Sequence, residues 1–157
     1  MVIQRWQSVM LLIAGVMMGL FSFLSLGQVQ TADYSFNITA LGIMREGIAT
    51  AAGEPEGVRT IVSFVLCLLA CIMPLVGIFC FRNMRLHKSI AIQSALYAAV
   101  AAALVIGEVY MFSSEVNGAA GWSSLIAAPF IAIVADLIAF RMISSDWKKM
   151  RAADRLR

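Results

Sequence analysis

A long apolar run that leads straight into a basic segment constrains the fold of this chain more than any other feature. The run covers residues 122–143, and residues 144–157 then carry five Lys or Arg side chains. Twenty-two residues in a helix measure about 33 Å, enough to cross a bilayer core of roughly 30 Å. Because a cluster of cations resists transfer through lipid, the segment predicts a membrane-crossing helix whose basic end stays in the cytoplasm.

The composition is typical of an integral membrane protein. Hydrophobic residues make up 61% of the 157 residues and charged residues 13%, against roughly 45–50% and 25% in soluble domains. A soluble fold of this composition would leave large apolar patches in water. Cys67, Cys71 and Cys80 lie in one apolar run, so they predict buried thiols and not a disulfide framework.

Four apolar runs predict four membrane crossings, over residues 8–26, 60–81, 89–111 and 122–143. The short connection at 82–88 requires the helices on either side of it to lie antiparallel. We therefore expect one all-α domain over residues 1–157, folded as an up-down-up-down bundle of four transmembrane helices. The first run could instead be a signal peptide, but its 19 residues exceed the roughly 7–15 of a signal core.

Residues 27–59 form the longest polar stretch and predict a small extracytoplasmic loop or cap. Within it, the apolar residues Tyr34, Phe36 and Ile38 alternate with polar ones, a period-two pattern that predicts a short strand. The sequence Gly-Glu-Pro-Glu-Gly at 53–57 predicts a turn before the second helix. A hairpin or a partly helical segment would both fit this stretch.

Basic residues near the membrane predict the orientation of the bundle. Ten lie on the side of the two termini and of the 82–88 connection, whereas two, Arg45 and Arg59, lie on the other. This asymmetry predicts that both termini and the connection are cytoplasmic. The ten are Arg5, Arg82, Arg85, Lys88, Arg141, Lys148, Lys149, Arg151, Arg155 and Arg157.

Three segments resemble a family of small membrane proteins from Bacteroidota, domain-of-unknown-function family 4293 (DUF4293). They are Ile3-Gln4-Arg5-Trp6-Gln7-Ser8, Phe81-Arg82-Asn83-Met84-Arg85-Leu86, and an ending with Arg141-Met142-Ile143, Asp146 and Arg151-Ala152-Ala153-Asp154-Arg155-Leu156-Arg157. The resemblance covers nearly the whole chain and implies a multi-pass protein of the bacterial inner membrane, with no assigned chemistry. The family's tail opens with an Asp-Glu pair, whereas here Trp147 follows Asp146.

Asp136 is the candidate intramembrane polar site. It lies about 10 Å inside the predicted cytoplasmic boundary, where a charged side chain costs a few kcal/mol and therefore faces the bundle, water or a partner. Gln93, Ser94 and Tyr97 on the third run lie at comparable depth and could donate hydrogen bonds. Asp136 could handle a proton or cation in a transporter, or it could be a hydrogen-bonded acid that fixes helix register or binds a partner.

Two other sets of residues are candidates for packing and docking. Gly15 and Gly19 form a small-xxx-small pair, which favours close helix packing within the bundle or in a dimer. The basic end predicts contacts with anionic lipid headgroups or with a partner, and helical spacing in residues 144–157 could extend the last helix beyond the membrane. The docking candidates are Arg82, Arg85, Asp146, Arg151, Asp154, Arg155 and Arg157.

The sequence contains no motif of a known catalytic, metal or cofactor site. His87 lies in the basic connection, where we expect it to be solvated, and it has no partners for a metal site. We expect no enzymatic activity, no cofactor and no nucleic-acid binding. The preferred function is a non-catalytic accessory or scaffold subunit that binds another membrane protein or a second copy of itself, and the alternative is a small oligomeric transporter or ion-conducting protein that uses Asp136.

Overall fold

The computed structural model describes residues 2–32, 35–46, 60–80 and 83–154, and the side chains of all of these except residues 2–5, 46, 153 and 154. Within these ranges the chain is mostly helical. The four long helices are α1 (Val2–Phe23), α2 (Ile61–Phe79), α3 (Met84–Glu115) and α4 (Ala128–Asp154), and the short 3₁₀ helix η1 (Ser124–Ala127) leads into α4.

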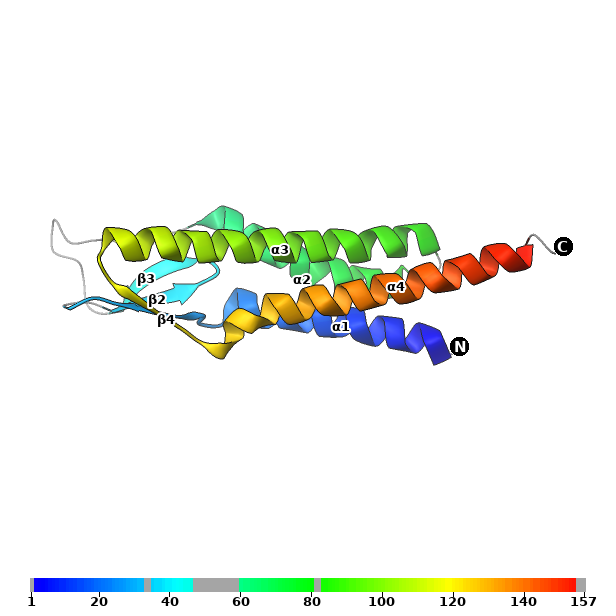
Figure 1. Cartoon of the computed structure of the whole chain (residues 1–157), viewed down its shortest axis with the longest axis horizontal. Helices are drawn as coiled ribbons and strands as arrows, with labels where there is room; N and C mark the ends of the chain where they lie inside the picture. The colour runs from blue at the N-terminus through cyan, green and yellow to red at the C-terminus, as the bar shows by residue number, and fades with distance from the viewer. Residues whose placement is uncertain (1, 33–34, 47–59, 81–82, 155–157) are drawn as a thin grey trace.

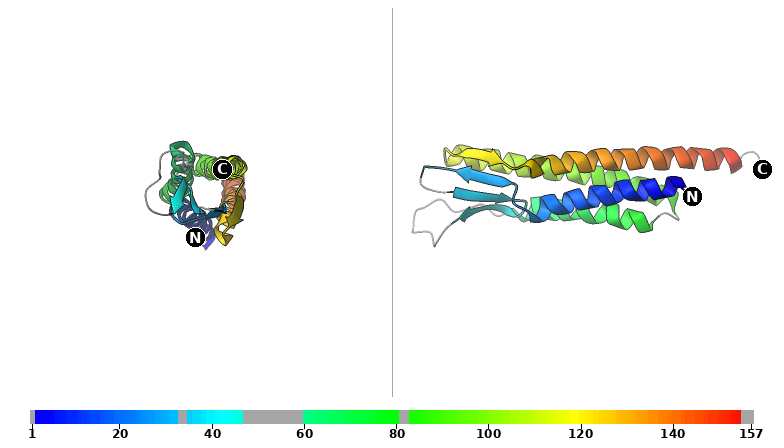
Figure 2. Two further views of the ribbon diagram at one scale, coloured as in Figure 1. Left: turned by 90° about the vertical axis from the view of Figure 1, so that its left-hand side faces the viewer. Right: turned by 90° about the horizontal axis from the view of Figure 1, so that it is seen from below.

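The four helices form an elongated antiparallel bundle (Figure 1). Each helix packs against the next along the chain, and α4 returns to pack against α1, which closes the ring (Figure 2). The start of α1 and the end of α4 lie at one end of the bundle, which we call the terminal end. The strands lie at the opposite end, which we call the sheet end.

All four predicted helices are present, with different bounds. The 82–88 connection is shorter than predicted, since α3 begins at Met84 after an Asn83 cap whose Oδ1 accepts a hydrogen bond from Leu86 N at 3.4 Å. Trp122, which we expected to begin the last helix, lies in a strand instead. α4 starts at Ala128 with Pro129 in its first turn, where a missing N–H costs nothing. It continues to Asp154, which confirms the predicted extension of the last helix.

A four-stranded antiparallel sheet corrects the all-α expectation. Its strands are β1 (Gly27–Gln30), β2 (Ser35–Thr39), β3 (Gly42–Glu46) and β4 (Ala119–Trp122), in the order β3-β2-β1-β4. β2 is the predicted strand, and its Phe36 and Ile38 are fully buried. The other three strands are short and lack the alternating pattern: β1 reads GQVQ and β4 reads AAGW. The predicted turn at 53–57 lies outside the described residues.

The sheet joins segments that are far apart in the sequence. β1 pairs with β2 on one side and with β4, which lies between α3 and α4, on the other. Gly27 and Gly121 approach so closely that a Cβ at Gly27 would lie 2.1 Å from Gly121 O, and Gly27 has a φ of +151°. Only glycine suits this position. The Phe36 ring meets the Phe112 ring edge-on at 4.9 Å, which packs the sheet against the last turns of α3.

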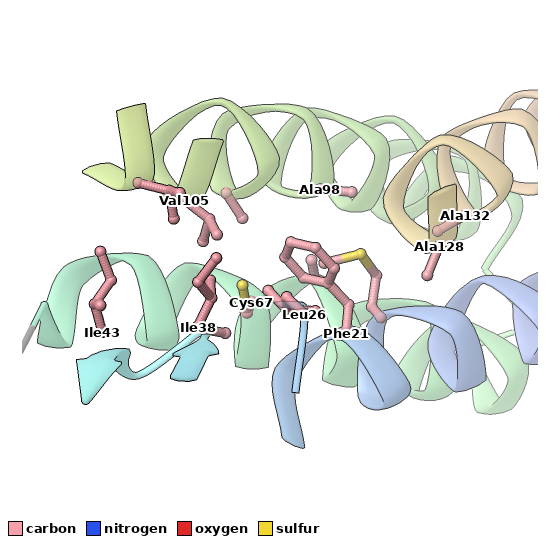
Figure 3. Packing of buried hydrophobic residues seen from close by; sticks show 14 of the residues in the cluster. Phe21, Leu26, Ile38, Ile43, Cys67, Ala98, Val105, Ala128 and Ala132 are labelled. Carbon is pink, nitrogen blue, oxygen red and sulfur yellow. The ribbon is translucent and has the colours of Figure 1, made fainter. Parts of the chain in front are cut away.

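The buried side chains form two separate apolar clusters. The larger one lies toward the sheet end and includes Phe21, Ile38, Val105 and Ala132 (Figure 3). The smaller one lies toward the terminal end and consists of Leu11, Ala91, Ala139 and Ile143, each fully buried. Many of the positions where helices meet are alanine or glycine, and these small side chains let helix backbones approach closely.

The outer faces of the helices are apolar as well. Large side chains such as Val16, Val65, Leu96 and Phe130 are about half exposed, and each belongs to a different long helix. All four long helices are long and apolar enough to cross a membrane. Helices that are apolar both inside and outside the bundle are typical of a chain that has lipid as its solvent.

Candidate functional site

Asp136 on α4 lies between the two apolar clusters. The larger cluster ends at Ala135 on this helix, and the smaller one begins at Ala139. The Asp136 side chain is fully buried, and neither carboxyl oxygen has a hydrogen-bond partner among the described residues. A carboxyl group in so apolar a layer is costly and is typically retained for a structural or functional reason.

Ser94 on α3 is the polar side chain beside this carboxyl group. It is fully buried, and its hydroxyl donates a hydrogen bond to Ala70 O on α2 at 3.3 Å. Pro74, one turn after Ala70, lacks the N–H that would otherwise bond this carbonyl. Ser94 therefore satisfies the acceptor that the proline leaves free, and its hydrogen bond joins α3 to α2 beside Asp136 of α4.

The order of donors in this layer fits a protonated Asp136. An ionised carboxylate requires donors, and the hydroxyl of Ser94 is already used by Ala70 O. A protonated Asp136 could donate to Ser94 Oγ, and Ser94 would continue to donate to Ala70 O. Two hydrogen bonds would then connect Asp136 on α4 to Ser94 on α3, and Ser94 to Ala70 O on α2, with one donor for each acceptor.

Gln93 and Tyr97, the other predicted members of this site, differ in burial. Gln93 is exposed on the outer face of α3, since adjacent residues of a helix are about 100° apart and Ser94 faces inward. Tyr97 is half-buried and packs against the larger cluster. The predicted burial of Asp136 is confirmed, but depth along a helix does not choose between neighbouring positions on it.

Glu108 lies in a different layer, near the sheet end. Its Oε2 lies 3.3 Å from Ser63 Oγ on α2, in the range of a hydrogen bond. Fourteen residues of α3 separate Glu108 from Ser94, a rise of about 21 Å. Fully buried apolar side chains such as Ala98 and Ala101 lie between them on the inner face of α3. Glu108 and Asp136 therefore lie in separate layers of the bundle.

The terminal end has its own buried polar groups. Gln7 on α1 is 2% exposed and donates a hydrogen bond through Nε2 to Asp146 Oδ2 on α4. The expectation of a solvated His87 is wrong, because α3 starts early enough to include it and turns it inward on the same face as Ala91. The side chain of His87 is 3% exposed, and its Nε2 has no hydrogen-bond partner among the described residues.

A family comparison covers almost the whole of this architecture. The model of the domain of unknown function DUF4293 matches residues 3–156. The chain belongs to the DUF4293 family. The match agrees with the resemblance seen in the three sequence segments. No curated protein matches the chain.

In this DUF4293 protein the two glycines face α2 of the same chain. A Cβ at Gly15 would lie 2.9 Å from Leu75 Cδ2 and 3.2 Å from Cys71 O. A Cβ at Gly19 would meet only Cys71 Sγ, at 3.5 Å. The close approach that Gly15 permits is therefore used within the bundle.

Those docking candidates that the structure describes lie at the terminal end of this DUF4293 protein. Arg85 is exposed, Asp146 bonds Gln7, and the Arg151 guanidinium lies 4.5 Å from the centre of the Trp147 ring. Arg82, Arg155 and Arg157 and the side chain of Asp154 lie outside the described residues. No group of three His, Cys, Asp or Glu residues in the described part of the chain could hold a metal ion. The cysteines are free thiols.

Proposed function

We propose that this protein is a four-helix integral protein of the bacterial inner membrane, with both termini and the α2–α3 connection in the cytoplasm. Six basic residues whose side chains the structure describes lie at the terminal end, and Arg45 lies in β3 at the sheet end. The excess of cations at the terminal end supports a cytoplasmic position for it. The six are Arg85, Lys88, Arg141, Lys148, Lys149 and Arg151.

Within this membrane placement, the preferred function is a non-catalytic accessory or scaffold subunit that binds another membrane protein or itself. The observation that carries this proposal is the end of α4, which extends beyond the other three helices (Figure 1). Residues 148–152 are all exposed, including the apolar Met150 at 52%. A projecting helix that combines basic and apolar residues suits the binding of a partner at the membrane surface.

A pull-down from native membranes tests the accessory function. The tagged full-length protein is solubilised in a mild detergent and compared with a variant that carries Met150→Glu, an exposed substitution that leaves the bundle core unchanged. We expect one membrane protein to co-purify stoichiometrically with the wild type and to be lost with the variant. Equal recovery of that protein with both would contradict docking through the end of α4.

A small oligomeric transporter or ion-conducting protein is the second candidate, because Asp136 is fully buried without a hydrogen-bond partner among the described residues. Intramembrane carboxyl groups of this kind occur on proton and ion pathways. The apolar clusters on both sides of Asp136 argue for the accessory function, since they separate this carboxyl group from the described carboxyl group of Glu108 toward the sheet end. Proton or solute uptake by proteoliposomes that is abolished by Asp136→Asn would establish the transporter.

A further inference from the structure

Two cations and two aromatic rings of α3 and α4 meet at the terminal end. The Lys88 ammonium of α3 lies 5.0 Å from the centre of the Phe140 ring and 5.5 Å from that of Trp147, both on α4. The Arg151 guanidinium lies 4.5 Å from the same Trp147 ring. Because both cations are this close to one ring, they are no more than about 10 Å apart.

The positive charge of this cluster is not neutralised within the described residues. No described carboxylate forms an ion pair with Lys88 or Arg151, and Asp146, the described acidic side chain nearest in sequence to Trp147, bonds Gln7 on α1. Cation–π contacts hold a cation in place but leave its charge, and each contributes about 0.5–1 kcal/mol at an exposed site. The cluster therefore presents two cations that have no counter-ion among the described side chains.

The cluster lies at the depth of phospholipid headgroups in the proposed membrane placement. The predicted span ends at Ile143, and Trp147 follows four residues later on α4, a rise of about 6 Å. The polar headgroup layer of one leaflet is roughly 5–8 Å thick. Tryptophan prefers this layer, because its ring is apolar and its N–H is a hydrogen-bond donor.

We propose that Lys88, Trp147 and Arg151 form a binding site for the phosphate group of an anionic phospholipid in the leaflet at the terminal end. Arg151 and Lys88 donate charge-assisted hydrogen bonds to the phosphate oxygens. The Trp147 ring between α3 and α4 keeps both cations near the headgroup layer. The acyl chains lie on the apolar outer surface of these helices, where Leu96 and Ile138 are exposed.

The site rests on the proposed membrane placement and predicts a preference among lipids. The purified full-length protein is titrated in a non-ionic detergent with phosphatidylglycerol or phosphatidylcholine, and bound lipids are counted by native mass spectrometry. The test variant carries K88Q and R151Q. The matched control carries K148Q and K149Q, which remove the same charge from exposed side chains of α4 that make no described contact with Trp147.

We expect one phosphatidylglycerol to bind more tightly than phosphatidylcholine and the test variant to bind it about 30-fold more weakly, roughly fivefold per charge, whereas the control changes less than threefold. Equal losses in the two variants would overturn the site in favour of diffuse attraction, and so would the absence of any preference for the anionic lipid. Displacement of the lipid by 10 mM inorganic phosphate would also overturn it. Unchanged helicity shows that both variants are folded.

A separate measurement distinguishes an error in the lipid-site proposal from an error in the proposed membrane placement. Cysteine labelling of the C-terminus in intact cells reports the orientation without reference to lipid binding. A C-terminus that is labelled from outside would overturn both proposals, whereas a protected C-terminus with unchanged lipid binding in the test variant would overturn the lipid site alone.

Discussion

Replacing Asp136 by asparagine tests the conclusion that this carboxyl group is neutral. The two side chains have nearly the same shape, and an amide N–H can donate to Ser94 Oγ as a protonated carboxyl group does. The site is fully buried. If Asp136 were ionised and paired with a bound cation or a partner, removal of its charge would cost about 3–5 kcal/mol. Exchange of one neutral donor for another costs far less, and interhelical hydrogen bonds in membranes average about 0.6 kcal/mol. We therefore expect Asp136→Asn to change the free energy of unfolding by less than about 1 kcal/mol.

The assay is reversible unfolding in mixed detergent micelles with increasing dodecyl sulfate, followed by circular dichroism. Ser94→Ala is the companion variant, and we expect it to lose about 1 kcal/mol because Ala70 O would have no donor. The double variant measures whether the two side chains are coupled. A loss above 3 kcal/mol for Asp136→Asn, with Ser94→Ala nearly neutral, would refute the neutral layer and favour an ionised carboxylate that holds a cation.

Three further substitutions test the packing and the sheet. Gly15→Leu should lower the free energy of unfolding by about 1–3 kcal/mol through overpacking against α2. In the same assay, Gly19→Ala should change the free energy of unfolding by less than about 0.5 kcal/mol. Equal effects would contradict the different spacing at the two sites. Gly27→Ala should disrupt the pairing of β1 with β4 because of the contact at 2.1 Å, seen as faster proteolysis at the sheet end, and unchanged cleavage would contradict it. Gln7→Leu should cost about 1 kcal/mol by removing the donor to Asp146, and a neutral or stabilising result would show that water replaces this bond.

The helices were predictable because their signals are long. Four apolar runs of about twenty residues are visible in composition alone, and the charged tail could be assigned to the last helix from its spacing. The bounds were less accurate because they depend on single residues. The cap at Asn83 and the proline at Pro129 shift two helix starts by several residues, and these shifts bury His87 and move Trp122 into a strand.

The sheet was largely missed because its strands carry almost no local signal. β2 alternates apolar and polar residues, but β1 and β4 are four residues long and contain glycine, and their pairing joins Gln28 to Gly121. The antiparallel course of the helices brings these two strands together, and neither strand carries a sequence pattern that would predict the pairing. Likewise, the position of Asp136 was evident, whereas its neighbour could not be chosen among Gln93, Ser94 and Tyr97 until the rotation of α3 was known.

The pairing of β1 with β4 has a consequence for biogenesis. β1 is synthesised directly after α1, yet the strand that completes its outer edge follows about ninety residues later, after α3. Until then, in the proposed membrane placement, the nascent chain exposes an open strand edge on the far side of the bilayer, where it could join the edge of another copy. In the proposed membrane placement, β4 reaches β1 only after α2 and α3 have crossed the bilayer, so completion of the small sheet depends on the insertion of these two helices.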